Sequence, residues 1–97
     1  MGQSTHNADY QLLLTVLRTV RQRQRVTQIE LAERLGNTQT FVSKCERGER
    51  RIDVVELVEF AEALRVNPVD ILTEFLNLRL RRPAISAKKA SRRLPSR

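Results

Sequence analysis

Apolar residues recur along most of this chain at the spacing of α-helices. Between residues 9 and 23 they stand three or four positions apart, at Tyr10, Leu13, Leu14, Leu17 and Val20. An α-helix has about 3.6 residues per turn, so this spacing places them on one face of a helix. The same periodicity predicts helices over 27–35 and 38–47, another opening at Asp53, and a last one from about residue 68. No segment alternates convincingly enough to predict a strand.

Capping residues mark the ends of these helices. Thr27 with Glu30, and Asp53 with Glu56, have the spacing of a capping box, in which each side chain bonds the other residue's backbone N–H. Gly36 follows the second helix, where glycine adopts the left-handed conformation that ends many helices at little cost. These signals predict short helices joined by short turns.

The order of these elements predicts an all-α fold, with one compact five-helix domain over residues 9–80. Residues 1–8 are polar, and we expect them to form a flexible N-terminus. Residues 81–97 are rich in Ser, Ala, Lys, Arg and Pro. We expect this basic tail to be disordered, because it carries too few apolar residues to fold alone.

The charge of the chain is strongly uneven. The net charge of +7 and the isoelectric point of about 11.0 indicate a polyanionic partner, either nucleic acid or an anionic membrane face. Residues 1–78 contain ten basic and eleven acidic residues, whereas residues 79–97 contain eight basic residues and no acidic one. The excess positive charge therefore belongs to the tail.

The chain offers little raw material for catalysis or metal binding. One cysteine, Cys45, and one histidine, His6, exclude an intramolecular disulfide and a Cys/His metal cluster. Glutamates at every third position from Glu56 to Glu62 are best interpreted as a solvated helix face. No apolar run approaches the ~18 residues of a membrane span, and no signal-peptide core follows Met1. We expect a cytoplasmic protein that is not an enzyme, binds no cofactor or metal and contacts no membrane.

The two central helices carry the most informative pattern. Their lengths and the glycine-containing turn between them match a helix-turn-helix. The spaced residues are Gln28-x-x-Leu31-Ala32-x-x-Leu35-Gly36-x-Thr38-Gln39-x-x-Val42-Ser43-Lys44-x-Glu46-Arg47-Gly48. This pattern resembles the phage-repressor-like, or Cro/cI-type, helix-turn-helix family. The resemblance covers roughly residues 12–76 and implies a repressor-like DNA-binding domain; Cys45 departs from it, because many relatives carry a bulkier residue there.

The helix over 38–47 has the chemistry of a DNA-reading helix. Four polar residues without an acid fall within an arc of about 140° at 100° per residue: Gln39, Thr40, Ser43 and Lys44. Such side chains can pair with base edges in the major groove, and we expect these four to contact bases. The alternative is a polar face that only meets solvent.

Six further residues are expected to contact DNA phosphates, and they are Gln28, Asn37, Thr38, Arg47, Arg50 and Arg51. Gln28 opens the second helix, where free backbone N–H groups attract a phosphate. The family resemblance also implies that Gln28 braces the recognition helix. Capping explains Thr38 equally well, and the arginines could serve only solubility.

Two structural contacts are also predicted. The resemblance implies a buried ion pair between Arg21 and Glu46, which links the first helix to the end of the recognition helix. The last helix carries apolar residues on more than one of its faces, and exposed apolar surfaces of this kind usually bind another protein surface. We therefore expect a homodimer with Ile71, Phe75 and Leu78 at its interface. A tail helix folded back over this region is the alternative.

Together these features predict a sequence-specific DNA-binding transcriptional regulator of a bacterium or its phage. We expect a homodimeric repressor that inserts the helix over 38–47 into the major groove of double-stranded DNA and excludes polymerase from a promoter. One alternative is an antitoxin-type module that binds a partner protein and regulates its own synthesis. The other is a nonspecific nucleic-acid binder that acts through its basic tail.

Overall fold

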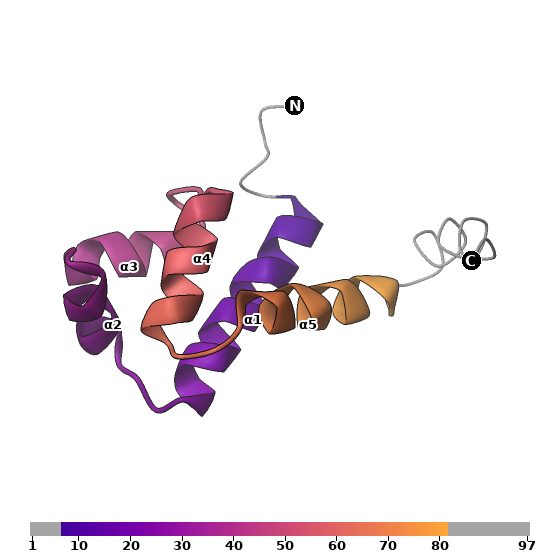
Figure 1. Ribbon diagram of the computed structural model, residues 1–97. Helices are drawn as coiled ribbons and strands as arrows, with labels where there is room; N and C mark the ends of the chain where they lie inside the picture. Colours follow the sequence, from indigo (N-terminus) through magenta and orange to yellow (C-terminus); the bar gives the residue numbers. More distant parts are fainter. Residues whose placement is uncertain (1–6, 82–97) are drawn as a thin grey trace.

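The computed structural model describes residues 7–81 of the 97-residue chain, and this part contains helices and no strand. Figure 1 shows the helices in chain order: α1 (Ala8–Arg23), α2 (Gln28–Leu35), α3 (Gln39–Arg47), α4 (Val54–Ala63) and α5 (Pro68–Leu80). The predicted all-α, five-helix fold is confirmed. The predicted flexible N-terminus (1–8) and disordered tail (81–97) fall mostly on residues 1–6 and 82–97, which lie outside the described residues. Of the rest, Asn7 caps α1 and Ala8 begins it, so the helix starts earlier than predicted, and Arg81 caps the end of α5.

The helices enclose one hydrophobic core. Helix α1 packs against α5 and α3, α2 packs against α3 and α4, and α4 packs against α5. Figure 1 shows α2 and α3 together at one end of the domain and the C-terminal end of α5 at the other. The core is built mainly from aliphatic side chains, and every helix contributes at least one of them: Leu17, Leu31, Val42, Leu57 and Ile71.

The predicted capping boxes define the starts of α2 and α4. The Thr27 hydroxyl accepts a hydrogen bond from the backbone N–H of Glu30 at 3.0 Å, and the Glu30 carboxylate accepts one from Thr27 at 2.9 Å. Asp53 and Glu56 exchange the same pair of bonds at 2.7 and 3.0 Å. Gly36 ends α2 with a left-handed φ of 68°, which turns the chain sharply into α3.

Side chains from distant positions cap the C-terminal end of α4. The guanidinium of Arg34, on α2, donates to the carbonyl oxygen of Ala63 at 2.8 Å. The amide of Gln24, which follows α1, donates to the carbonyl oxygen of Leu64 at 3.1 Å. The last carbonyls of a helix have no partner within it, so these two bonds fasten α4 to the first half of the domain.

Helix α5 has two apolar stripes, and this corrects the predicted dimer interface. Ile71 is only 1% exposed and lies in the core, and Phe75 and Leu78 pack against the same core. Ile71 is therefore unavailable to a partner, and its assignment to a dimer interface is wrong. The stripe that remains at the surface consists of Val69, Leu72, Leu76 and Leu80, which are 62, 43, 51 and 49% exposed; we call it the outer stripe.

Candidate nucleic-acid interface

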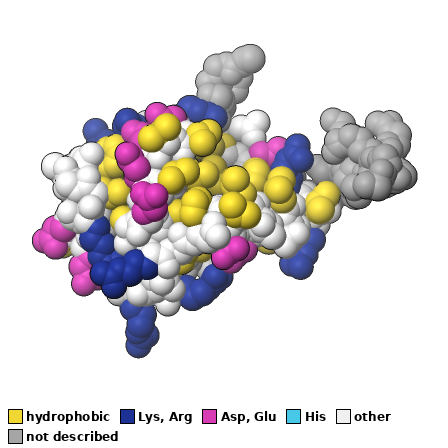
Figure 2. Space-filling model, in the orientation of Figure 1, with side chains coloured by type: hydrophobic (Ala, Val, Ile, Leu, Met, Phe, Trp, Pro, Cys, Tyr) yellow, Lys and Arg dark blue, Asp and Glu magenta, His cyan; other side chains and the backbone are white. Residues whose placement is uncertain are grey.

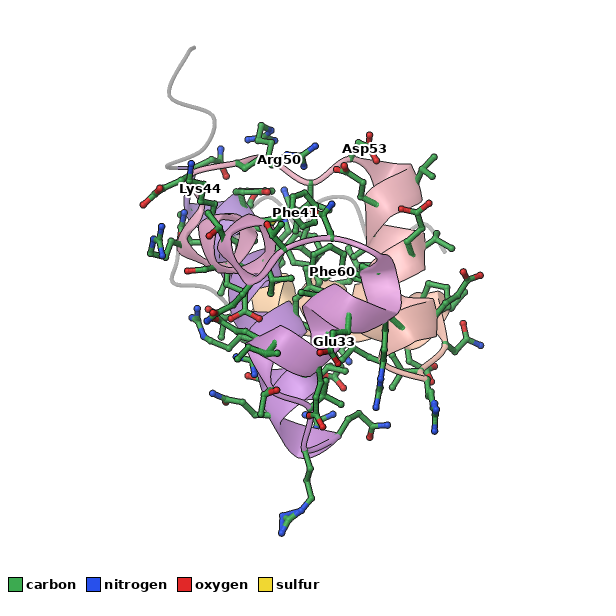
Figure 3. All side chains as sticks on the ribbon, turned by 90° about the vertical axis from the view of Figure 1, so that its left-hand side faces the viewer. Glu33, Phe41, Lys44, Arg50, Asp53 and Phe60 are labelled. Carbon is green, nitrogen blue, oxygen red and sulfur yellow. The ribbon has the colours of Figure 1, made fainter. Side chains whose placement is uncertain are left out.

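Helix α3 is held with its apolar side inward and its polar side outward. Val42 and Cys45 are fully buried, whereas Gln39, Thr40 and Lys44 are exposed. The Thr38 hydroxyl caps the helix by accepting from the backbone N–H of Phe41 at 3.1 Å. In Figure 3, Lys44 lies at the periphery of the molecule, away from the interior that Phe60 occupies. Three of the four predicted base-contacting residues therefore form one exposed face.

The structure contains the predicted ion pair between Arg21 and Glu46. The Arg21 Nε and Nη2 atoms donate to the two carboxylate oxygens of Glu46 at 2.6 and 3.0 Å, and Nη1 donates to the carbonyl oxygen of Val26 at 2.8 Å. Both residues are buried, at 9 and 8% exposure. The pairing satisfies both charges and fastens the end of α3 to α1.

A chain of hydrogen bonds runs from this pair to the outer face of α3. The amide nitrogen of Gln28 donates to Glu46 Oε1 at 2.9 Å. The amide nitrogen of Gln39 then donates to Gln28 Oε1 at 3.2 Å. Gln28 therefore connects the buried carboxylate of Glu46 to Gln39, the first residue of α3, and its hydrogen bond orients the Gln39 amide.

Arg47 forms a second cluster at the C-terminal end of α3. Its guanidinium donates to both carboxylate oxygens of Glu49 at 2.8 and 3.2 Å, and it also donates to the hydroxyl of Ser43. The hydrogen bond from Arg47 lowers the pKa of Glu49. An acidic side chain thus stands beside the predicted DNA-reading face. The sequence pattern gave no reason to single out Glu49.

Arg50 and Arg51 lie in the loop between α3 and α4, and each stacks on an aromatic ring of a helix. The Arg50 Nη1 and Nη2 atoms donate to Glu56 Oε1 and Oε2 at 3.0 and 2.8 Å, and the guanidinium carbon lies 4.8 Å from the centre of the Phe41 ring. Arg51 lies 4.3 Å from the centre of the Tyr10 ring. The Tyr10 hydroxyl accepts from the backbone N–H of Ile52 at 2.9 Å. These contacts fasten the loop to α3 and α4 through Arg50 and to α1 through Tyr10.

Within residues 7–81 no three His, Cys, Asp or Glu side chains gather closely enough to hold a metal ion. Cys45 is buried, and this burial raises the pKa of its thiol. In the same part of the chain, no helix combines the length and the apolar character needed to cross a membrane.

The fold and the outward polar face of α3 define a helix-turn-helix domain. A model of the helix-turn-helix family matches residues 17–71, which is more than half of the chain. The chain belongs to this family, in its XRE or Cro/cI-type branch, whose members are DNA-binding transcriptional regulators and not a class of enzymes.

Individual relatives agree with this assignment. The chain is 39% identical to an uncharacterized HTH-type transcriptional regulator of Sinorhizobium fredii. The match extends over 54 residues, which are 56% of this chain and 70% of that protein. It is 42% identical, with a TM-score of 0.71, to an XRE-family-like protein of Pseudomonas syringae, and the match covers 78% of this chain and 93% of that one. The clp gene regulator ClgR from C. glutamicum is 28% identical, with a TM-score of 0.67 and coverage of 74 and 94%.

A fourth similarity concerns the fold alone. A mutant restriction-modification controller protein superposes with a TM-score of 0.72 over 79% of this chain and 98% of its own, at 22% identity. The family model and the relatives of higher identity confirm the resemblance to the phage-repressor-like family that the sequence indicated.

Proposed function

We propose that this protein binds a specific double-stranded DNA sequence as a cytoplasmic homodimer, with α3 in the major groove, and represses transcription. The observation that carries the proposal is the orientation of α3. Two fully buried residues, Val42 and Cys45, fix its inner side, and an acid-free polar face points outward. The names of two relatives, an HTH-type transcriptional regulator and a clp gene regulator, support a regulatory role.

The side chains on the outer face of α3 suit base edges. The Gln39 amide can bond both N6 and N7 of an adenine, and Lys44 can donate to O6 or N7 of a guanine. The methyl group of Thr40 can meet the methyl group of a thymine. Ser43 is half-buried and its hydroxyl accepts from Arg47, which leaves its O–H able to donate to an acceptor on a base.

Around this face, five of the six predicted phosphate contacts keep that proposed role: Gln28, Asn37, Thr38, Arg47 and Arg51. All but the half-buried Gln28 are exposed. Phosphate contacts of this kind set the register of the protein on the duplex but read no sequence. Arg50 is left out of the group, because its guanidinium both bonds Glu56 of α4 and stacks on the Phe41 ring of α3, whereas Arg47 bonds only its near neighbours Ser43 and Glu49.

The outer stripe of α5 is the proposed dimer surface. Figure 2 shows apolar side chains gathered along α5 and over α4 on one face of the domain. Val54 and Val55, at the start of α4, are 75 and 66% exposed and add to the apolar surface outside the stripe. To read two half-sites one turn of DNA apart, a two-fold dimer through α5 has to hold its two α3 helices about 34 Å apart.

Selection of bound duplexes from random DNA by the full chain tests the proposal. We expect enrichment of a pseudo-palindrome whose half-sites lie one helical turn apart. Equal recovery of all sequences would instead indicate nonspecific binding through the basic tail. Sedimentation that shows only monomer, both free and on DNA, would exclude the homodimer, and a stable complex with a second protein would identify the antitoxin-type alternative.

A further inference from the structure

The guanidinium of Arg50 lies between the recognition helix and α4. One of its faces covers the ring of Phe41 on α3, and its edge bonds both carboxylate oxygens of Glu56 on α4. Nη1 also donates to the carbonyl oxygen of Arg51 at 2.8 Å. A planar guanidinium that stacks and binds bidentately at once has a fixed position, which a lysine ammonium could not reproduce.

Both partners of Arg50 are themselves anchored. Phe41 packs against Phe60 of α4, with 6.2 Å between the ring centres. Glu56 belongs to the capping box of α4, so its carboxylate also accepts from the backbone N–H of Asp53. Figure 3 shows Arg50, Phe41 and Phe60 following one another from the surface toward the interior. The contacts form a continuous path from the exposed loop to the contact between α3 and α4.

We propose that Arg50 is a positioning residue that sets the orientation of α3 relative to α4, and that it does not neutralise a DNA phosphate. This inference rests on the proposed DNA binding. We call the Arg50–Glu56 ion pair the latch. When it is broken, α3 can tilt, because the Arg50 guanidinium no longer covers the solvent side of the Phe41 ring. Loss of the latch affects discrimination between bases, because base contacts depend on the angle of α3 whereas phosphate attraction does not.

Four variants of the full chain test the latch: Arg50→Gln, Arg50→Lys, Glu56→Gln and the double variant Arg50→Gln/Glu56→Gln. Glutamine at position 56 keeps the acceptor for the Asp53 N–H, so the cap of α4 survives. Arg65→Lys is the matched control, because it makes the same replacement at an exposed arginine outside the proposed DNA contacts. Affinities are measured against salt concentration on a selected site and on random duplex DNA.

We expect Arg50→Gln, Arg50→Lys and Glu56→Gln each to reduce the preference for the selected site about three- to tenfold, and the double variant to be no worse than either glutamine variant. The slope of log affinity against log salt should stay unchanged in Arg50→Gln, and Arg65→Lys should keep the preference of the wild type for the selected site. A phosphate contact predicts the opposite pattern. Arg50→Gln would lower the slope by about 0.9, Arg50→Lys would bind normally, and Glu56→Gln would bind all DNA more tightly.

Amide hydrogen exchange separates this inference from the proposed function. In both Arg50→Gln and Glu56→Gln, a rise in amide exchange over the wild type that is larger in α3 than in α2 would support the latch. This result would hold even if the wild-type chain bound no specific DNA. Unchanged exchange in α3 in both variants would overturn it.

Discussion

Truncation of Glu46 to alanine is expected to destabilise the domain severely. The side chains of Arg21 and Glu46 are only 11 and 7% exposed, and two of the three hydrogen bonds of the guanidinium go to this carboxylate. Without Glu46, Arg21 remains as a buried charge with a single carbonyl partner. Breaking a buried pair in this way costs about 3–5 kcal/mol.

The cost can be measured by thermal unfolding. For a domain of this size each kcal/mol corresponds to about 4–8 °C in melting temperature, so Glu46→Ala should melt roughly 12–40 °C below the wild type. A control replaces both partners with apolar residues of similar volume, Arg21→Met with Glu46→Leu. That double variant should recover most of the lost stability, because no charge is left unpaired. A loss below about 1 kcal/mol in Glu46→Ala would refute the reasoning, since that is the range of exposed pairs.

Four further predictions concern DNA binding and assembly. Gln39→Ala should cost about 1–3 kcal/mol on the selected site and relax the preference at one base pair, measured by anisotropy on substituted duplexes; an unchanged preference would remove Gln39 from the reading face. Deletion of residues 83–97 removes five basic side chains. If the tail follows the phosphates, the salt slope should fall by up to about 0.9 per lost contact, equally on selected and random DNA, and an unchanged slope would end that role. Leu76→Glu in the outer stripe should yield a monomer in sedimentation, whereas Asn77→Glu on the flank of the same helix should not; a dimer in both would place the interface elsewhere. Glu49→Gln removes a negative charge beside α3 and releases Arg47, so it should tighten binding and steepen the salt slope, and weaker binding would show that Glu49 orients Arg47 productively.

Local signals in the sequence were sufficient to predict the helices and the motif. Capping boxes such as Thr27 with Glu30 involve residues three positions apart, so short-range chemistry decides them. The ion pair between Arg21 and Glu46 spans 25 positions, and only the family resemblance indicated it.

The remaining contacts depend on how distant elements pack. Both apolar stripes of α5 have helical spacing, so periodicity could not show that Ile71 faces the core and Leu76 the solvent. Arg50 appeared in the sequence as one of several loop cations. Its partners Phe41 and Glu56 belong to the helices on either side, and they meet only after α3 has packed on α4.

The single cysteine of the chain lies on the buried side of α3, in its last turn, and this has a practical consequence for measuring motion. Cys45 is fully buried, so a thiol reagent can react with it only when the recognition helix detaches or the domain unfolds. The labelling rate in excess reagent therefore reports the frequency of that opening. Slower labelling on a DNA duplex than in free solution would measure how strongly binding suppresses the detachment of α3, with no engineered probe in the protein.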